Sequence, residues 1–281
     1  MKYYIIAGEA SGDLHGANLL KALFKAEPDA EVRFWGGDLM QNVGGTLVKH
    51  YKDLAFMGFA EVITNLNTIL KNIDFCKKDI KAFKPDVIIF IDYPGFNMRI
   101  AKWAKQQGFD THYYISPQIW AWKEGRIKAI KRDVNHMYVI LPFEKDFYEK
   151  KHQYPVHYVG HPLLDEIEEF KKNQSGNFNE KHQLDDRPII ALLPGSRKQE
   201  ISRLLTEMLR IVNDYPQFQF VIAGAPSLNA AFYQPFIKQE NVKLILNDTY
   251  NLLNNAFAAI VTSGTATLET ALFNVPQAVV Y

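Results

Sequence analysis

Two turns that combine glycines with acidic or hydroxyl side chains lie near opposite ends of the chain. The first, GEASGD, runs from Gly8 to Asp13, and the second, SGTATLE, runs from Ser263 to Glu269. Each follows an apolar run and precedes a helical pattern. Ligands of open α/β folds collect beyond the carboxyl ends of the strands, and helix N-termini attract anions. The two turns therefore predict two facing half-sites, an arrangement that suits a two-substrate transferase.

The first turn favours a polyol such as a sugar over a phosphate. Gly8 and Gly12 permit backbone conformations that other residues resist. Glu9 and Asp13 are carboxylates, which a phosphate-binding loop would avoid, whereas a sugar hydroxyl donates hydrogen bonds to them. The spacing matches neither a dinucleotide fingerprint nor a Walker motif. The alternative is a tight turn in which Ser11 or Asp13 only caps the following helix.

A third candidate is Asp92, which stands directly after the apolar strand predicted over 87–91. Active sites of α/β folds form at this end of a strand. A partly buried aspartate beside apolar neighbours has a raised pKa, which suits a general base that takes a proton from an attacking hydroxyl. The alternative is that Asp92 caps the helix expected from Phe96 onward.

A basic turn follows the strand predicted over 189–193. Gly195, Ser196 and Arg197 open a helical pattern, and Lys198 adds a second positive charge. Backbone amides at a helix start, together with a guanidinium that grips two phosphate oxygens, predict a diphosphate clamp. A capped helix with solvated basic side chains is the alternative.

The last turn offers a second helix N-terminus compatible with an anion. Ser263, Gly264 and Thr265 precede the helix, and Glu269 lies four residues after Thr265 on the same helix face. A carboxylate in that place is able to hold a ribose diol. The alternative for Glu269 is an ordinary exposed helix residue.

Length and composition limit the function classes. A chain of 281 residues with 47% hydrophobic and 13% aromatic residues predicts two domains with substantial cores. A formal net charge of +1 argues against a nucleic-acid partner. Cys76 has no second cysteine to pair with, and the apolar run 3–7 is too short for a signal peptide or a membrane span. These features predict a cytoplasmic location without transmembrane segments.

Short apolar runs alternate with helical patterns along the chain, which predicts two parallel α/β units. The segment 170–187 is polar and lacks apolar periodicity, so we expect a linker there, between domains over 1–169 and 188–281. The strands are expected over 3–7, 31–35, 87–91, 111–115, 137–141 and 156–159, and then over 189–193, 219–223, 242–246, 258–261 and 278–280.

Taken in order, these motifs resemble the lipid-A-disaccharide synthase family of bacterial glycosyltransferases, and the likeness covers nearly the whole chain. The segments that carry it are 8–13, 53–59 with Glu61 and Val62, 91–97, 114–122, 141–144, 160–162, 193–197 and 263–269. The resemblance implies two facing doubly wound, Rossmann-like domains of the GT-B type, with an acceptor side in the first and a UDP-sugar side in the second.

The resemblance also implies a reaction. Diacylglucosamine passes from UDP to the 6-hydroxyl of lipid X, an acylated glucosamine 1-phosphate, which gives a β-1,6 disaccharide and UDP. An α-linked donor and a β product require inversion, so one in-line displacement suffices. Asp92 is the expected base, Arg197 and the amides at 263–265 stabilise the leaving diphosphate, and Glu269 holds the ribose.

The acceptor and sugar side is expected to involve Glu9, Ser11, Gly12, Asp13 and Asn97. No His, Cys or carboxylate residues show metal-ligand spacing in the sequence, so we expect no cofactor and no obligatory metal.

A lipid substrate needs a route from the membrane, and the segment from Phe56 to Ile73 is the candidate. Its apolar residues recur at helical spacing, and lysines at 71, 77, 78, 81 and 84 follow. The pattern predicts a peripheral contact with the cytoplasmic face of the inner membrane. A helix that packs into the core is the alternative. Basic residues at 126, 128, 131 and 132 would extend the membrane surface or lie on a solvated helix face. Aromatic residues within 114–122 would line an acyl channel or pack in the core.

Members of the family continue beyond the position that matches Tyr281, so we expect the second domain to be incomplete. A UDP-sugar epimerase, another transferase of this architecture, or a UDP-sugar-binding fragment without catalysis remain alternatives. The sequence leaves open a homodimer, the acyl-chain length and which carboxylate is the base.

Overall fold

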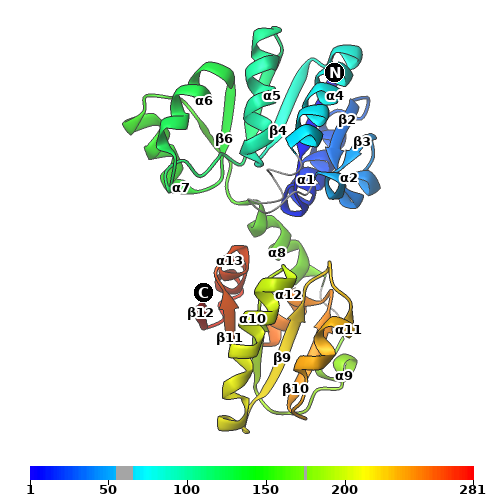
Figure 1. Ribbon diagram of the computed structural model, residues 1–281, viewed down its shortest axis with the longest axis vertical. Coiled ribbons are helices and arrows are strands. Elements are labelled where there is room, and N and C mark those ends of the chain that lie inside the picture. The colour runs from blue at the N-terminus through cyan, green and yellow to red at the C-terminus, as the bar shows by residue number, and fades with distance from the viewer. Residues whose placement is uncertain (55–65, 174–175) are drawn as a thin grey trace. The chain divides into compact units, whose positions relative to one another are not determined.

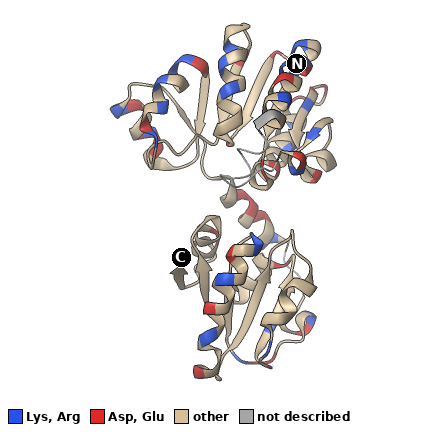
Figure 2. Cartoon of the chain, viewed as in Figure 1, with Lys and Arg blue, Asp and Glu red and all other residues tan. Residues whose placement is uncertain are grey.

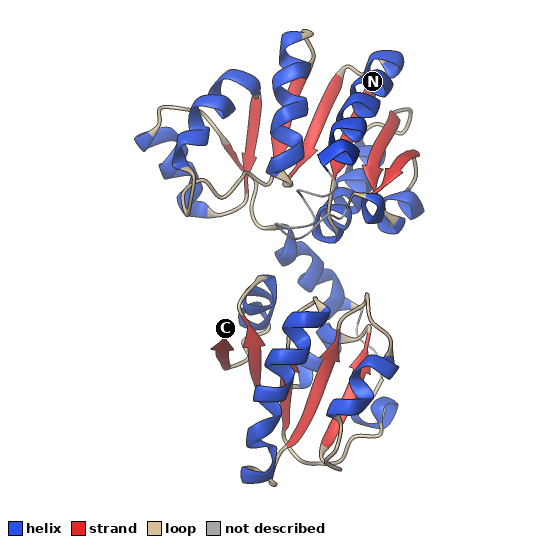
Figure 3. Ribbon diagram, in the orientation of Figure 1, coloured by secondary structure: helices blue, strands red, loops and turns tan. Residues whose placement is uncertain are grey.

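The computed structural model describes residues 1–54, 66–173 and 176–281. They form two compact units, Met1–Pro162 and Leu163–Tyr281. Each unit is a parallel sheet between helices, as Figures 1 and 3 show. The predicted α/β class with two Rossmann-like sheets is therefore confirmed. No helix in the described ranges is long and apolar enough to cross a membrane.

The first sheet has seven parallel strands in the order β3-β2-β1-β4-β5-β6-β7. The strand order reverses between β1 and β4, which places the carboxyl ends of these two strands side by side at a topological switch point. The strands are β1 (Lys2–Ala7), β2 (Glu31–Gly36), β3 (Thr46–His50), β4 (Val87–Ile91), β5 (Asp110–Tyr114), β6 (His136–Val139) and β7 (His157–Tyr158).

Side chains of the first sheet alternate between two apolar cores. On β1, Tyr4 and Ile6 face one core, whereas Ile5 and Ala7 face the other. Helices α1 and α2 cover the Ile5 face, and α4, α5 and α6 cover the Tyr4 face. The helical segments are α1 (Ala10–Ala26), α2 (Asp38–Val43), η1 (Tyr51–Asp53), α4 (Leu66–Phe83), α5 (Pro94–Gln106), η2 (Glu124–Arg126), α6 (Ile127–Asp133), α7 (Pro142–Asp146) and the π-helical turn η3 (Phe147–Lys151).

The second sheet has five parallel strands in the order β10-β9-β8-β11-β12, and its order reverses between β8 and β11. It also lies between two apolar cores. Its strands are β8 (Ile189–Leu193), β9 (Gln219–Gly224), β10 (Val242–Leu246), β11 (Ala258–Thr262) and β12 (Gln277–Val280). Its helical segments are α8 (Pro162–Lys172), α9 (Phe178–His182), α10 (Lys198–Met208), η4 (Leu209–Asp214), α11 (Ala230–Tyr233), η5 (Gln234–Phe236), α12 (Thr249–Asn255) and α13 (Thr265–Leu272).

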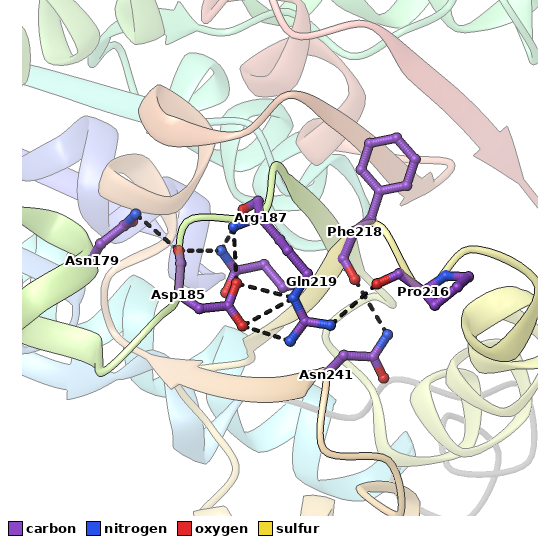
Figure 4. A network of polar contacts seen from close by, with 7 residues as sticks. All are labelled: Asn179, Asp185, Arg187, Pro216, Phe218, Gln219 and Asn241. Atoms are coloured by element: carbon purple, nitrogen blue, oxygen red, sulfur yellow. Dashed lines mark hydrogen bonds and ion pairs between the residues drawn. The ribbon is translucent and has the colours of Figure 1, made fainter.

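The segment predicted as a linker, 170–187, falls inside the second unit. It holds the end of α8 and the short helix α9, and it is tied to β9 by the polar network of Figure 4. There the Gln219 amide donates to the backbone oxygens of Asp185 (2.9 Å) and Arg187 (2.5 Å). The Arg187 guanidinium pairs with the Asp185 carboxylate and donates to the Pro216 carbonyl at 3.2 Å. These contacts fix the entry into β8.

Candidate active site

The carboxyl ends of β1, β4 and β5 bring together the first group of site residues. Glu9 follows β1, and Asp92 follows β4 at the neighbouring strand end. Asp92 has φ of +43°, Tyr93 +48° and Ile115 +63°, so three residues other than glycine adopt the left-handed region at this edge. Such conformations cost energy and persist only where the surroundings impose them. Their clustering at the switch point supports a functional site here.

Three hydrogen bonds hold the Asp92 backbone in its conformation. Its N–H donates to the Tyr114 carbonyl at 3.1 Å. Its carbonyl accepts from the Tyr113 hydroxyl at 2.6 Å and from the Asn97 amide at 2.8 Å. The Asn97 amide also contacts the carbonyls of Ile6 (3.3 Å) and Ile91 (3.2 Å). Asn97 is fully buried, so in this structure its side chain positions the ends of β1 and β4 beneath Asp92.

The Asp92 carboxyl group has an environment that disfavours its charge. Burial is the larger cause and the negative charge of Glu9 the smaller, and together they raise the pKa of Asp92 to about 6. A hydrogen bond from the Tyr93 backbone opposes the shift. A carboxylate with a pKa close to the working pH is well matched to accepting a proton.

A cavity of about 260 Å³ opens beside Asp92. Its wall combines one carboxylate, one guanidinium and mainly apolar or amide side chains, which suits an amphipathic, partly anionic ligand. The lining residues are Asp92, Pro94, Ile115, Ser116, Gln118, Ile119, Trp122 and Arg126.

Arg126 brings the positive charge to this cavity. Its guanidinium lies 5.4 Å from the centre of the Trp122 ring, and its side chain is half-buried. Within the described residues it forms no ion pair with a carboxylate. From the sequence we expected Arg126 on a membrane surface or on a solvated helix face, because nothing in its local pattern shows that η2 returns to the end of β4.

Asp13, Ser11 and Gly12 differ in burial and in their contacts. Asp13 is 2% exposed, and its carboxylate accepts from the backbone amides of Gly37 (2.7 Å), Leu39 (3.1 Å) and Met40 (3.1 Å). It therefore caps α2, a helix far away in sequence, and not α1, in whose first turn it lies. Ser11 is exposed at the start of α1, and Gly12 is buried against Ala7.

In the second unit the two anion-compatible turns follow neighbouring strands. The turn with Gly195, Ser196 and Arg197 follows β8, and the one with Ser263 follows β11, which pairs with β8. Gly195 has φ of +109°, and an added Cβ would lie 2.3 Å from the Glu200 carboxylate. That carboxylate accepts from the Ser196 amide at 3.3 Å, while Arg197 is exposed. Sequence reasoning did not include Glu200.

One backbone amide of the last turn already donates a hydrogen bond within the sheet. The Ser263 amide donates to the Val280 carbonyl at 3.1 Å, so the amides of Gly264 and Thr265 at the start of α13 are the better candidates for an anion. Glu269 is half-buried and accepts from the Tyr250 hydroxyl at 3.3 Å. Burial raises its pKa, and the Tyr250 hydrogen bond opposes the shift.

Two parallel α/β units, each with polar turns at a switch point, define a Rossmann-type architecture of glycosyltransferases and UDP-sugar epimerases. Solved structures agree. A UDP-GlcNAc 2-epimerase from Neisseria meningitidis bound to UDP-GlcNAc matches with a TM-score of 0.70 at 15% identity, over 99% of this chain and 82% of that one. The S. aureus MnaA–UDP co-structure matches with a TM-score of 0.72 at 15% identity, over 100% and 79%. At this identity the likeness concerns the fold.

Sequence comparison gives the family. The lipid-A-disaccharide synthetase family model matches residues 3–281. The lipid-A-disaccharide synthase of Coxiella burnetii (strain Dugway 5J108-111) is 42% identical over 99% of this chain and 74% of its own length. That of Syntrophus aciditrophicus (strain SB) is 41% identical over the same shares. The chain belongs to the lipid-A-disaccharide synthase family and is a glycosyltransferase of lipid A biosynthesis.

Proposed function

We propose that the chain transfers 2,3-diacylglucosamine from UDP to the 6-hydroxyl of lipid X in one inverting displacement. Asp92 carries the proposal, since it is a half-buried carboxylate with a raised pKa at a cavity on the switch point. Asp92 takes the proton of the 6-hydroxyl as that oxygen bonds to the anomeric carbon. The bond from that carbon to the diphosphate oxygen breaks, and its electron pair leaves with UDP.

The second unit would receive the leaving group. Arg197 and the amides of Gly264 and Thr265 would neutralise charge as it develops on the diphosphate, and Glu269 would hold the ribose. Gly195 and Ser196 would shape the same turn. The side-by-side strands β8 and β11 support this assignment because both turns leave one edge of the sheet.

The first unit would receive the acceptor. Glu9 and Ser11 would contact sugar hydroxyls, while Gly12, Asp13 and Asn97 would keep β1, α1 and α2 in place around them. Arg126 would bind the acceptor phosphate, because it supplies the positive charge of a cavity that also holds Asp92. Trp122 and Ile119 would contact the first part of an acyl chain.

We further propose that the chain works as a peripheral protein at the cytoplasmic face of the inner membrane. Residues 55–65 of the predicted apolar stripe lie outside the described residues. In α4, Ile73 is buried and Ile69 packs against the same core, whereas Leu70 (48%) and Phe75 (47%) are exposed. Figure 2 shows lysine and arginine positions in blue on α4, α5 and α6. Flotation with anionic but not zwitterionic vesicles would support membrane binding, and equal recovery with both would count against it.

A mass-spectrometric assay with UDP-diacylglucosamine and lipid X tests the reaction. We expect disaccharide and UDP from the parent chain and at least ~100-fold less from Asp92→Ala, a typical loss for a general base. Asp86→Ala is the matched control, since Asp86 precedes β4 at the opposite end of the strand. UDP binding without disaccharide from the parent would overturn the proposal in favour of a binding protein.

A further inference from the structure

We propose that the first unit has a divalent transition-metal site, formed by Asp110, His112 and His136, toward the amino ends of β5 and β6, whereas Asp92 follows the carboxyl end of β4. Asp110 and His112 lie on β5 and His136 on β6, where His112 and His136 are register partners. One ligand atom from each of the three residues lies within 4.8 Å of the other two. Because the residues come from two strands, spacing along the sequence did not reveal the cluster.

The distances suit a small metal ion. His112 Nε2 lies 3.0 Å and His136 Nε2 lies 3.9 Å from the Asp110 carboxylate oxygens. Zinc binds imidazole nitrogen and carboxylate oxygen at roughly 2.0–2.2 Å, which places tetrahedral donors about 3.3–3.6 Å apart. The two distances, to Oδ2 and Oδ1 of Asp110 respectively, bracket that range, and the three donors lie within 4.8 Å of one another, so side-chain rotations would bring them onto one ion.

The donor set also indicates the class of metal. Two imidazoles and one carboxylate favour Zn²⁺, Co²⁺, Ni²⁺ or Cu²⁺ over Mg²⁺ and Ca²⁺, which prefer oxygen ligands alone. Among the described residues this is the one group of three or more His, Cys, Asp or Glu with such spacing. His112 is half-buried, whereas the side chains of Asp110 (40%) and His136 (45%) are more exposed, which gives the ion both protein donors and access from solvent.

Neighbouring residues support the ligands. The Tyr138 hydroxyl lies 3.1 Å from His112 Nδ1, so a hydrogen bond there orients the ring with Nε2 toward Asp110. Such outer partners fix the tautomer and orientation of metal-binding histidines. On β7, the His157 ring stacks on Tyr138 at 5.3 Å and lies 6.3 Å from the His136 ring. His157 or a water would take the fourth position.

The position of the site predicts what the metal does. Asp110 pairs with Val87 at the start of β4, whereas Asp92 follows its end, roughly 16 Å along the strand direction. The ion would join β5 to β6 and leave the proton transfer at Asp92 unaffected. It therefore acts on stability: binding to the native state alone raises the melting temperature in proportion to the logarithm of free metal.

Calorimetric titration of the EDTA-treated chain with Zn²⁺ tests the site, with Co²⁺ absorption as a second probe. We expect one equivalent at micromolar affinity or tighter, tetrahedral cobalt bands and a higher melting temperature. His112→Ala, His136→Ala and Asp110→Asn should each weaken binding at least ~10-fold, with unchanged circular dichroism. His152→Ala is the control, because His152 also lies beside a carboxylate, 3.0 Å from Glu124.

Three outcomes would overturn the proposal. One is absence of stoichiometric binding by the parent chain. The second is binding that persists in all three ligand variants, and the third is binding that disappears in His152→Ala.

Discussion

At the scale of single residues, Asp92 links the reaction to pH. Its pKa of about 6 reflects burial first and the charge of Glu9 second. A base must be deprotonated, so kcat/KM should fall as pH drops below about 6. Glu9→Gln removes the like charge and should move this acid limb to lower pH. Parallel pH profiles of kcat/KM measure the shift. An unchanged acid limb in Glu9→Gln would show that Glu9 does not raise the pKa of Asp92.

The same carboxyl group should lower stability at neutral pH. Its folded pKa lies above the value of 3.8 for a free aspartate, so the native state binds more protons between pH 4 and 6. The stability that the protonated Asp92 contributes is therefore fully present below pH 4 and is lost as pH rises through 6. Asp92→Asn removes the ionisation and should gain about 2–3 kcal/mol at pH 7.5.

Urea unfolding of both chains at pH 7.5 and pH 4 measures this difference. The gain should shrink at pH 4, and a gain of equal size at both pH values would point to a cause other than ionisation.

Arg126 should distinguish acceptors by their charge. Arg126→Gln should raise the KM for lipid X about 10- to 100-fold with little change in kcat, the usual effect of losing a hydrogen bond to a charged group. Lys128→Gln, an exposed residue of α6, is the control. With a dephosphorylated acceptor the Arg126 variant and its parent should have similar KM values. An equal loss with both acceptors would mean that Arg126 does not contact the phosphate.

Residues at strand ends could be inferred from the sequence, and residues from distant segments could not. Asp92 follows an apolar run directly, so its place at the site edge depends only on β4. The contact of the Tyr113 hydroxyl with the Asp92 carbonyl depends on pairing between β4 and β5. Asp13 caps α2 because α1 packs against α2, a tertiary fact without a local signal.

At the scale of elements, the turn between β1 and α1 should require glycine at position 8. A Cβ built there would lie 2.2 Å from the Tyr93 ring, next to Asp92. Gly8→Ala should therefore displace Tyr93 and lower kcat at least ~10-fold, since small displacements of reacting groups are costly. Gly95→Ala, with nothing within 4 Å and a place in the first turn of α5, is the control. Equal kcat in both variants would show that Tyr93 moves without disturbing Asp92.

Apolar strands were predicted more accurately than a short, partly polar edge strand. The predictions for the central strands β4 and β8 match the observed bounds, because near-continuous apolar runs are typical of central parallel strands, and the prediction for the mainly apolar edge strand β10 matches as well. The edge strand β3 was not predicted, since its sequence, TLVKH, is short and only partly buried. In the described part of α4, burial of Ile73, Cys76 and Ile80 explains much of the periodicity by core packing.

At the scale of the whole molecule, the two units have separate apolar cores. Each core is large enough for cooperative unfolding, so calorimetry should show two transitions. UDP should raise the midpoint of one transition, that of the second unit, and leave the other unchanged. In Arg197→Ala, UDP should no longer raise that midpoint. One transition that shifts as a whole would indicate that the units unfold together.

Whole-chain organisation was predicted in outline. Two α/β units follow from the alternation of strands and helices. The polar segment 170–187 suggested a linker because it lacks apolar periodicity, yet its polar groups serve the network around Arg187 and Gln219. Such a network has no hydrophobic signature, so composition alone resembles that of an exposed connection.

The left-handed backbone at Asp92, Tyr93 and Ile115 lowers stability, so selection for stability and selection for activity should favour different residues at position 92. Each such residue costs roughly 1–2 kcal/mol that glycine would save. Tyr93 and Ile115 also pack against the apolar cores, so a variant library sorted by expression or protease resistance should accumulate glycine at position 92. The same library sorted by product formation should retain aspartate at 92. The contrast between the two enrichment maps would mark the active end of β4 without a ligand-bound structure.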